Sequence, residues 1–172
     1  MKKITFILLY YLIFIIGCED SNKNDNTDNN ITEVVTSNIY VSSFYYNLVS
    51  KSEVASDEMW HFSAQLKDVV YNSNTYTMPN IILGNIYAML SENSFTETTV
   101  PPSENSAWYL DNSVVEYGGM DEIINYNMIT HVASIENPEN TFIIYETNGH
   151  TTYKVQFLEY ASGIVSLQFS PL

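Results

Sequence analysis

The closing stretch of the chain, residues 141–169, constrains the fold more than any other segment. Three runs of apolar residues in it repeat at every second position, which is the period of a half-buried strand. The repeating residues are Phe142 and Ile144; Tyr153, Val155 and Phe157; and Val165, Leu167 and Phe169. Asn148-Gly149 between the first two runs is typical of a type I′ hairpin turn with two positive φ angles, and Gly163 precedes the third run. The sequence therefore predicts a three-stranded C-terminal meander, whose apolar face an earlier part of the chain must cover.

The period of two recurs in the first half of the chain. From Trp60 to Lys67, apolar residues alternate with polar ones over eight positions, which predicts a strand. After Pro79, two apolar segments flank Gly84-Asn85, and either a hairpin or a short helix fits them. We therefore expect an all-β fold, mainly antiparallel sheet with a C-terminal β-meander and minor helix, in one domain spanning residues 31–172.

The N-terminus has the pattern of an export signal. Lys2 and Lys3 precede an apolar run that ends at Ile16, and this run is short for a permanent membrane helix. Gly17-Cys18 resembles a bacterial lipobox, in which the cysteine is lipidated. We expect a signal peptide at 1–17 and a lipidated Cys18 with a flexible acidic tether at 18–30, which places the domain outside the cytoplasm on the outer membrane or cell surface. The alternative is an uncleaved anchor helix with an incidental cysteine.

The charge of the chain excludes one class of partner. The formal net charge is −14, and it becomes −16 once Lys2 and Lys3 leave with the signal peptide. All six basic residues are lysines, and the chain has no arginine. Binding to nucleic acid depends on Lys and Arg that neutralise phosphates, so we expect no nucleic-acid partner.

Catalytic and metal-binding patterns are missing from the sequence. No G-x-S-x-G elbow or glycine-rich phosphate loop occurs, and the single cysteine lies at the expected lipid anchor. His61, His131 and His150 are isolated, without the spacing that places two ligands of a zinc ion on one element. We therefore expect a non-enzymatic protein.

Three segments together resemble one protein family. They are WHFSAQLKDVVYNSNTYTMPN from Trp60, FTETTVPP from Phe95 and the closing stretch TFIIYETNGHTTYKVQFLEYASGIVSLQF from Thr141. The chain resembles the HmuY-like haem-binding lipoproteins of Bacteroidetes, which end in a similar strand, Asn/Asp-Gly turn, Tyr-Lys strand and glycine-initiated last strand. The resemblance implies a surface or periplasm-facing lipoprotein that binds haem, takes part in haem and iron acquisition, and passes haem to an outer-membrane receptor.

The resemblance also implies a ligand set for the haem iron. The family holds the iron between two axial His or Met side chains on neighbouring hairpin-like projections. By position, Met128 matches the second ligand and Met120 is the nearest match to the first, with His131 as the rival candidate. Tyr109, Tyr117 and Tyr126 lie close to both methionines in the sequence and are candidate pocket aromatics. A thioether is a soft, neutral ligand that suits ferrous haem.

Two other function classes fit the same composition. A surface adhesin or carbohydrate-binding β module would use the abundant aromatic residues, 14 Tyr, 8 Phe and 2 Trp, as stacking platforms. A structural component of an outer-membrane assembly would bind partner proteins and no small molecule. The sequence separates neither from the haem-binding interpretation except through the family resemblance.

The lipid anchor gives a direct test. We expect Cys18→Ser to release the protein from the membrane fraction, because acylation supplies the apolar anchor that the acidic domain lacks. Fractionation followed by immunoblotting measures the change. Processing of the wild type that is insensitive to globomycin would count against lipidation.

Overall fold

The described chain folds into strands and turns. The computed structural model describes residues 30–103, 108, 114–127 and 129–172, and these residues contain eleven strands and no α-helix. The predicted all-β, antiparallel fold is confirmed, and the minor helix is not seen among the described residues. The expected signal peptide at 1–17, Cys18 and the tether up to residue 29 lie outside the described residues. No helix in the described part is long and apolar enough to cross a membrane.

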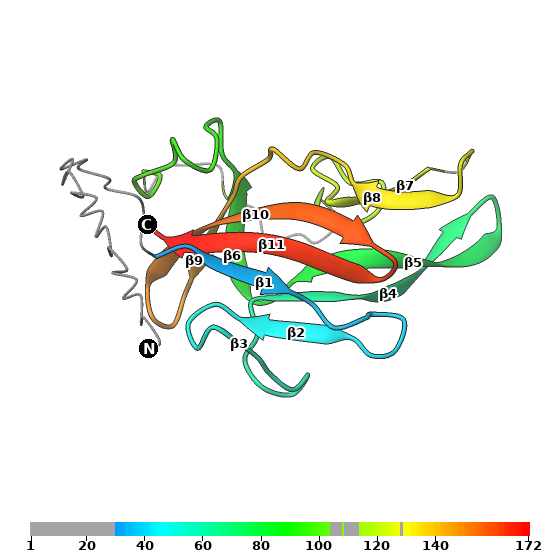
Figure 1. Cartoon of the computed structure of the whole chain (residues 1–172), viewed down its shortest axis with the longest axis horizontal. Helices are drawn as coiled ribbons and strands as arrows, with labels where there is room; N and C mark the ends of the chain where they lie inside the picture. Colours follow the sequence, from blue (N-terminus) through cyan, green and yellow to red (C-terminus); the bar gives the residue numbers. More distant parts are fainter. Residues whose placement is uncertain (1–29, 104–107, 109–113, 128) are drawn as a thin grey trace, which may run out of the picture.

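The predicted meander forms the centre of the larger sheet (Figure 1). This five-stranded sheet has the order β1-β11-β10-β9-β6. Its strands are β1 (Thr32–Val35), β6 (Ile86–Leu90), β9 (Phe142–Glu146), β10 (Thr151–Ala161) and β11 (Ile164–Pro171). All neighbouring strands run antiparallel, and the repeating apolar residues of the meander are buried. The period of two therefore predicted both the strands and their inner face.

A second sheet covers the inner face of the meander. Its order is β3-β2-β4-β5, with β2 (Phe44–Asn47), β3 (Ser52–Glu53), β4 (Phe62–Tyr71) and β5 (Asn74–Leu83). Phe62 of β4 packs edge-on against Phe157 of β10, with ring centroids 5.9 Å apart. Tyr46 of β2 packs in the same way against Phe169 of β11, also at 5.9 Å. The two sheets form a sandwich with one apolar core between them.

The segment after Pro79 is neither a hairpin nor a helix. Its two halves are the end of β5 and the whole of β6, and these strands belong to different sheets. Pro79 is tolerated because β5 is an edge strand of the smaller sheet. At the crossing, the main chain of Gly84 passes so close to Trp60 that a Cβ would lie 2.3 Å from the Trp60 carbonyl oxygen. This corner therefore requires glycine.

The predicted type I′ turn at Asn148-Gly149 is wrong. β9 and β10 are joined by four residues, 147–150, and His150 is the one with a positive φ, +54°. The buried Glu146 carboxylate accepts hydrogen bonds from the main-chain N–H groups of Asn148, at 2.6 Å, and Gly149, so it replaces the short turn with a capped loop. Gly149 is needed for this close approach, since a Cβ there would lie 2.8 Å from Glu146 Oε2.

Two-residue turns with two positive φ angles occur at other positions. They are Asn72-Ser73 between β4 and β5, and Ser162-Gly163 between β10 and β11. The first of them closes a long hairpin whose far end is exposed.

A third, two-stranded sheet lies beside this long hairpin. β7 (Ile124–Asn127) pairs with β8 (Val132–Ile135), and the pair contacts both β5 and β10. The β4–β5 and β7–β8 hairpins extend from the sandwich in the same direction (Figure 1).

The core packing can be tested on one strand. Phe62→Ala should lower the free energy of unfolding by about 3–5 kcal/mol, because it removes a fully buried ring that packs on both sheets. Val70→Ala on the same strand is the matched control, since Val70 is 72% exposed and should change stability by about 0.5 kcal/mol or less. Urea unfolding measures both. Equal effects of the two variants would contradict the sandwich.

Candidate functional site

The loop between β7 and β8 presents a histidine in a fixed orientation. Asn127 Oδ1 accepts hydrogen bonds from the N–H groups of Ile129 and Thr130, both at 2.9 Å, and the Asn127 carbonyl accepts one from the His131 N–H at 2.8 Å. This cap ends with His131 at a φ of +56°, in the left-handed region. The His131 ring then lies beside Tyr126, whose Oη is 2.9 Å from His131 Nδ1.

The Tyr126–His131 hydrogen bond leaves one ring nitrogen for a ligand. His131 is exposed, and among the described residues Tyr126 is the hydrogen-bond partner of its ring. When Nδ1–H donates to the tyrosine oxygen, Nε2 keeps a lone pair. Metal-binding histidines commonly use this arrangement, in which one nitrogen is held by a hydrogen bond and the other ligates.

His131 and Tyr126 line a hollow between the two projecting hairpins, which we call the hairpin groove. Its volume is about 510 Å³, within the range of small-molecule sites. Its other walls come from β5, from the start of β8, from the end of β10, and from the β1–β2 loop and the β10–β11 turn. They are Tyr76, Thr77, Met78 and Pro79; Val132 and Ala133; and Tyr40, Tyr160 and Ser162. Four tyrosine rings therefore surround one groove that has an accessible imidazole at its edge.

One of these tyrosines is held neutral. Burial, together with the 3.1 Å hydrogen bond from Tyr160 Oη to Tyr40 Oη, raises the pKa of Tyr160 far above its ordinary value of 10.0. Tyrosine ligates iron as the phenolate. Tyr160 is therefore suited to be a wall of the groove rather than a metal ligand.

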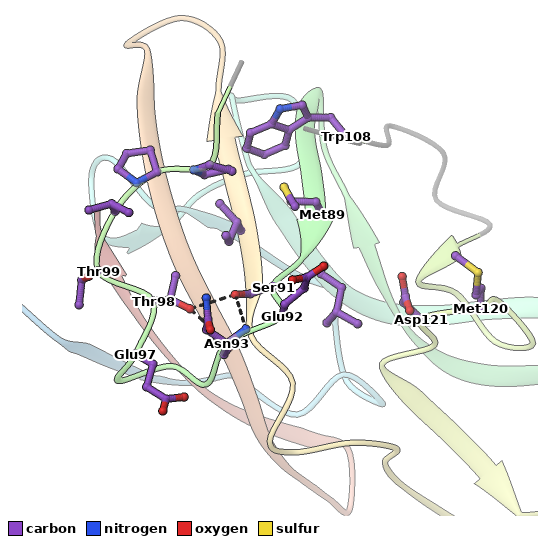
Figure 2. A pocket seen from close by; sticks show the side chains of 15 residues that line it. Met89, Ser91, Glu92, Asn93, Glu97, Thr98, Thr99, Trp108, Met120 and Asp121 are labelled. Carbon is purple, nitrogen blue, oxygen red and sulfur yellow. Dashed lines mark hydrogen bonds between the residues drawn. The ribbon is translucent and has the colours of Figure 1, made fainter. Parts of the chain in front are cut away.

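The sequence-predicted site residues do not gather around one hollow. Tyr126 and His131 share the hairpin groove, but the 85% exposed Met120 lines a different hollow, beside Asp121 (Figure 2). Tyr117 lies in neither, and its N–H donates to Asn80 Oδ1 at 3.0 Å, which ties its loop to β5. Met128 and Tyr109 lie outside the described residues, as does Cys18.

Sequence reasoning missed the other three tyrosines of the groove. Tyr40, Tyr76 and Tyr160 are separated by 36 to 120 positions in the chain, and only the sheet topology brings them together. A local signal did exist for His131, because an asparagine four residues before it is typical of a capped turn. Of the other two histidines, His61 is buried and His150 is exposed at the β9–β10 loop.

Comparisons with protein-family models, curated proteins and solved structures found no match. Among the described residues, no three His, Cys, Asp or Glu side chains are grouped to hold a bare metal ion.

The neutral Tyr160 predicts a loss of stability at alkaline pH. Its pKa is raised in the folded chain, so its contribution is fully present below the unfolded value of 10.0 and is lost as pH rises beyond it. Between pH 9 and pH 11, Tyr160→Phe should therefore lose less stability than the wild type in urea unfolding. Tyr71→Phe, at an exposed position before the β4–β5 turn, is the control and should behave as the wild type. An unchanged pH slope in Tyr160→Phe would contradict this assignment.

Proposed function

We propose that this protein is a non-enzymatic, lipid-anchored protein of the outer membrane or cell surface that binds haem in the hairpin groove. In this proposal it contributes to haem and iron acquisition and passes haem to an outer-membrane receptor. The supporting observation is the His131 ring, whose Nδ1 is held by Tyr126 while its Nε2 is left for a ligand at the edge of an aromatic groove.

The chemistry of the groove fits a haem. A haem is flat and largely apolar, and it supplies an iron whose axial positions bind imidazole or thioether. The rings of Tyr40, Tyr76, Tyr126 and Tyr160 offer large apolar surfaces with polar tips that remain hydrogen-bonded or hydrated. The two hairpins that form the groove come from separate sheets, so a ligand between them would contact both.

His131 is the described residue best suited to hold the iron. Its ring orientation is fixed by two links, the Asn127 cap on its main chain and the Tyr126 hydrogen bond on its side chain. Met128, three positions earlier, is the ligand that the family resemblance favours. Met120 lines another hollow, so a pair of Met120 and His131 would require the loops that carry them to rearrange.

A haemin titration of the full chain tests this proposal. We expect a shifted Soret band in the wild type, and a low-spin spectrum in the ferric state, in the dithionite-reduced state or in both. His131→Ala should weaken binding at least about tenfold and change the spin state, because one axial ligand is lost. Met128→Ala and Met120→Ala, titrated in parallel, identify thioether ligands.

His150→Ala is a matched control for His131→Ala. His150 is also exposed, has a positive φ, and lies with its Nδ1 2.6 Å from a tyrosine oxygen, that of Tyr145, but it does not line the groove. Binding in His150→Ala should equal that of the wild type. An unchanged spectrum in His131→Ala together with a lost one in Met128→Ala would move the ligand to Met128. A wild type without any Soret shift in either oxidation state would reject haem binding.

A further inference from the structure

A row of three aromatic rings lies on the outer face of the larger sheet. Tyr87 of β6 and Tyr145 of β9 are direct partners across the two strands, with ring centroids 6.2 Å apart and planes tilted by 47°. Tyr145 also contacts Trp108, with ring centroids 6.2 Å apart and planes tilted by 52°. Tyr145 therefore touches both of the other rings.

These rings are not needed for the core. Their strand neighbours Ala88 and Ile144 are fully buried between the sheets, so Tyr87 and Tyr145 point to the opposite face. Tyr87 is 40% exposed, and Tyr145 and Trp108 are partly exposed. Three contacting, partly exposed rings form a contiguous aromatic patch, and such patches are typical of binding surfaces.

Two hollows meet at these rings. One, of about 400 Å³, is lined by the three rings together with Pro102, Ser103 and Thr152. The other, of about 700 Å³, shares Pro102 and Trp108 with it and continues past Met89 to Glu92 and Asp121 (Figure 2). We call the two together the outer trough. It is distinct from the hairpin groove, with which it shares no lining residue.

The outer trough has an aromatic half and a mixed half. The mixed half combines apolar side chains such as Met89, Val100 and Ile143 with three carboxylates, one amide and several hydroxyls, and its described lining includes no lysine or arginine. Glu97 is held in place by Ser94, whose Oγ donates to Oε2 at 2.6 Å, and this bond lowers the pKa of Glu97. Glu92 and Asp121 line the same hollow, and burial raises the pKa of Asp121.

This division selects the ligand by its chemistry. An anionic ligand would be repelled by three carboxylates and by a chain with a net charge of −14. A purely apolar ligand would strip water from those carboxylates without replacing their hydrogen bonds. A ligand with apolar C–H faces and many hydroxyl donors satisfies both halves, because the faces stack on rings and the hydroxyls donate to carboxylates.

We propose that the outer trough is a binding site for a neutral oligosaccharide, with Tyr87, Tyr145 and Trp108 stacking on successive sugar rings and Glu92 and Asp121 accepting hydrogen bonds from hydroxyls. The extent of the trough favours several sugar units, because two hollows adjoin at Pro102 and Trp108. This site is independent of the proposed haem groove.

The test uses neutral oligosaccharides of four to six units from the gluco, manno, xylo and chito series, titrated calorimetrically into the full chain. At least one series should bind the wild type, and Tyr145→Ala and Tyr87→Ala should each weaken that binding about tenfold. Tyr145→Phe should keep most of it, because the stacking face remains. Tyr71→Ala is the matched control, since Tyr71 is 49% exposed near the β4–β5 turn and lines none of the three hollows.

Fluorescence locates the binding. The chain has two tryptophans, so Trp60→Phe leaves Trp108 as the reporter, and the bound oligosaccharide should shift its emission. Oligogalacturonate, as an anionic probe, should not bind. The proposal is overturned if no neutral series binds, if binding is unaffected by Tyr145→Ala, or if choline shifts the Trp108 emission while the sugars do not, which would indicate a cation site. Haemin titration of the same tyrosine variants should match the wild type, so a failure of one site is distinguishable from a failure of the other.

Discussion

The packing of the two larger sheets against each other is the interaction on which the other features of this molecule depend. The rings of Phe62 and Phe157 meet edge-on between the sheets, and apolar residues from both sheets surround them. Because side chains alternate along a strand, burying Ile144 and Ala88 in this core requires Tyr145 and Tyr87 to face outward. The core thus determines which residues are available to a ligand, because every second side chain of a strand faces the core and those between face outward.

Three buried polar residues tie the two larger sheets to neighbouring loops. Glu146 lies within the sandwich edge and caps the β9–β10 loop through two main-chain N–H groups. Lys154 is also buried, and its Nζ donates to the Thr98 carbonyl at 3.1 Å and lies 4.6 Å from the centre of the Phe95 ring. The Glu146 hydrogen bonds position the β9–β10 loop, which follows Tyr145. The Lys154 contacts hold the segment around Thr98, which forms one wall of the outer trough. Burying these charges costs free energy, which the hydrogen bonds offset only while the loops keep their positions.

The third buried polar residue, His61, links strands within the smaller sheet. Its Nδ1 accepts the Leu48 N–H at 2.9 Å, and its carbonyl accepts the Gly84 N–H at the crossing between the sheets. Burial lowers the pKa of His61, and the nearby Glu146 carboxylate opposes this effect only in part. Because Nδ1 accepts a hydrogen bond, the ring is neutral with its proton on Nε2, and this buried Nε2 has no hydrogen-bond partner among the described residues.

The sequence predicted those parts of the fold that depend on local periodicity. The meander and the strand after Trp60 follow from a period of two, which each segment carries in its own residues. The predicted type I′ turn at Asn148-Gly149 was wrong because the turn preference of an Asn-Gly pair takes no account of Glu146. The Glu146 carboxylate accepts hydrogen bonds from the N–H groups of a longer loop. The hairpin or helix expected around Gly84 was wrong for another reason, since apolar periodicity does not indicate which sheet a strand joins. Within the hairpin groove, Tyr126 and His131 are near in sequence and could be proposed, whereas Tyr40 meets Tyr160 only through the pairing of β10 with β11 and the loop after β1.

The negative charge of the chain affects the binding free energy of the two proposed ligands differently. A haem carries two carboxylates, and the described lining of the hairpin groove offers no lysine or arginine to pair with them. Its propionates would therefore stay in water, where salt screens their repulsion from the protein, and the binding free energy would have to come from ring contacts and the axial ligand. A neutral sugar in the outer trough meets the same field without any repulsion. Neither site relies on an ion pair, which is consistent with a chain that has 20 acidic residues and only six lysines, two of them in the expected leader.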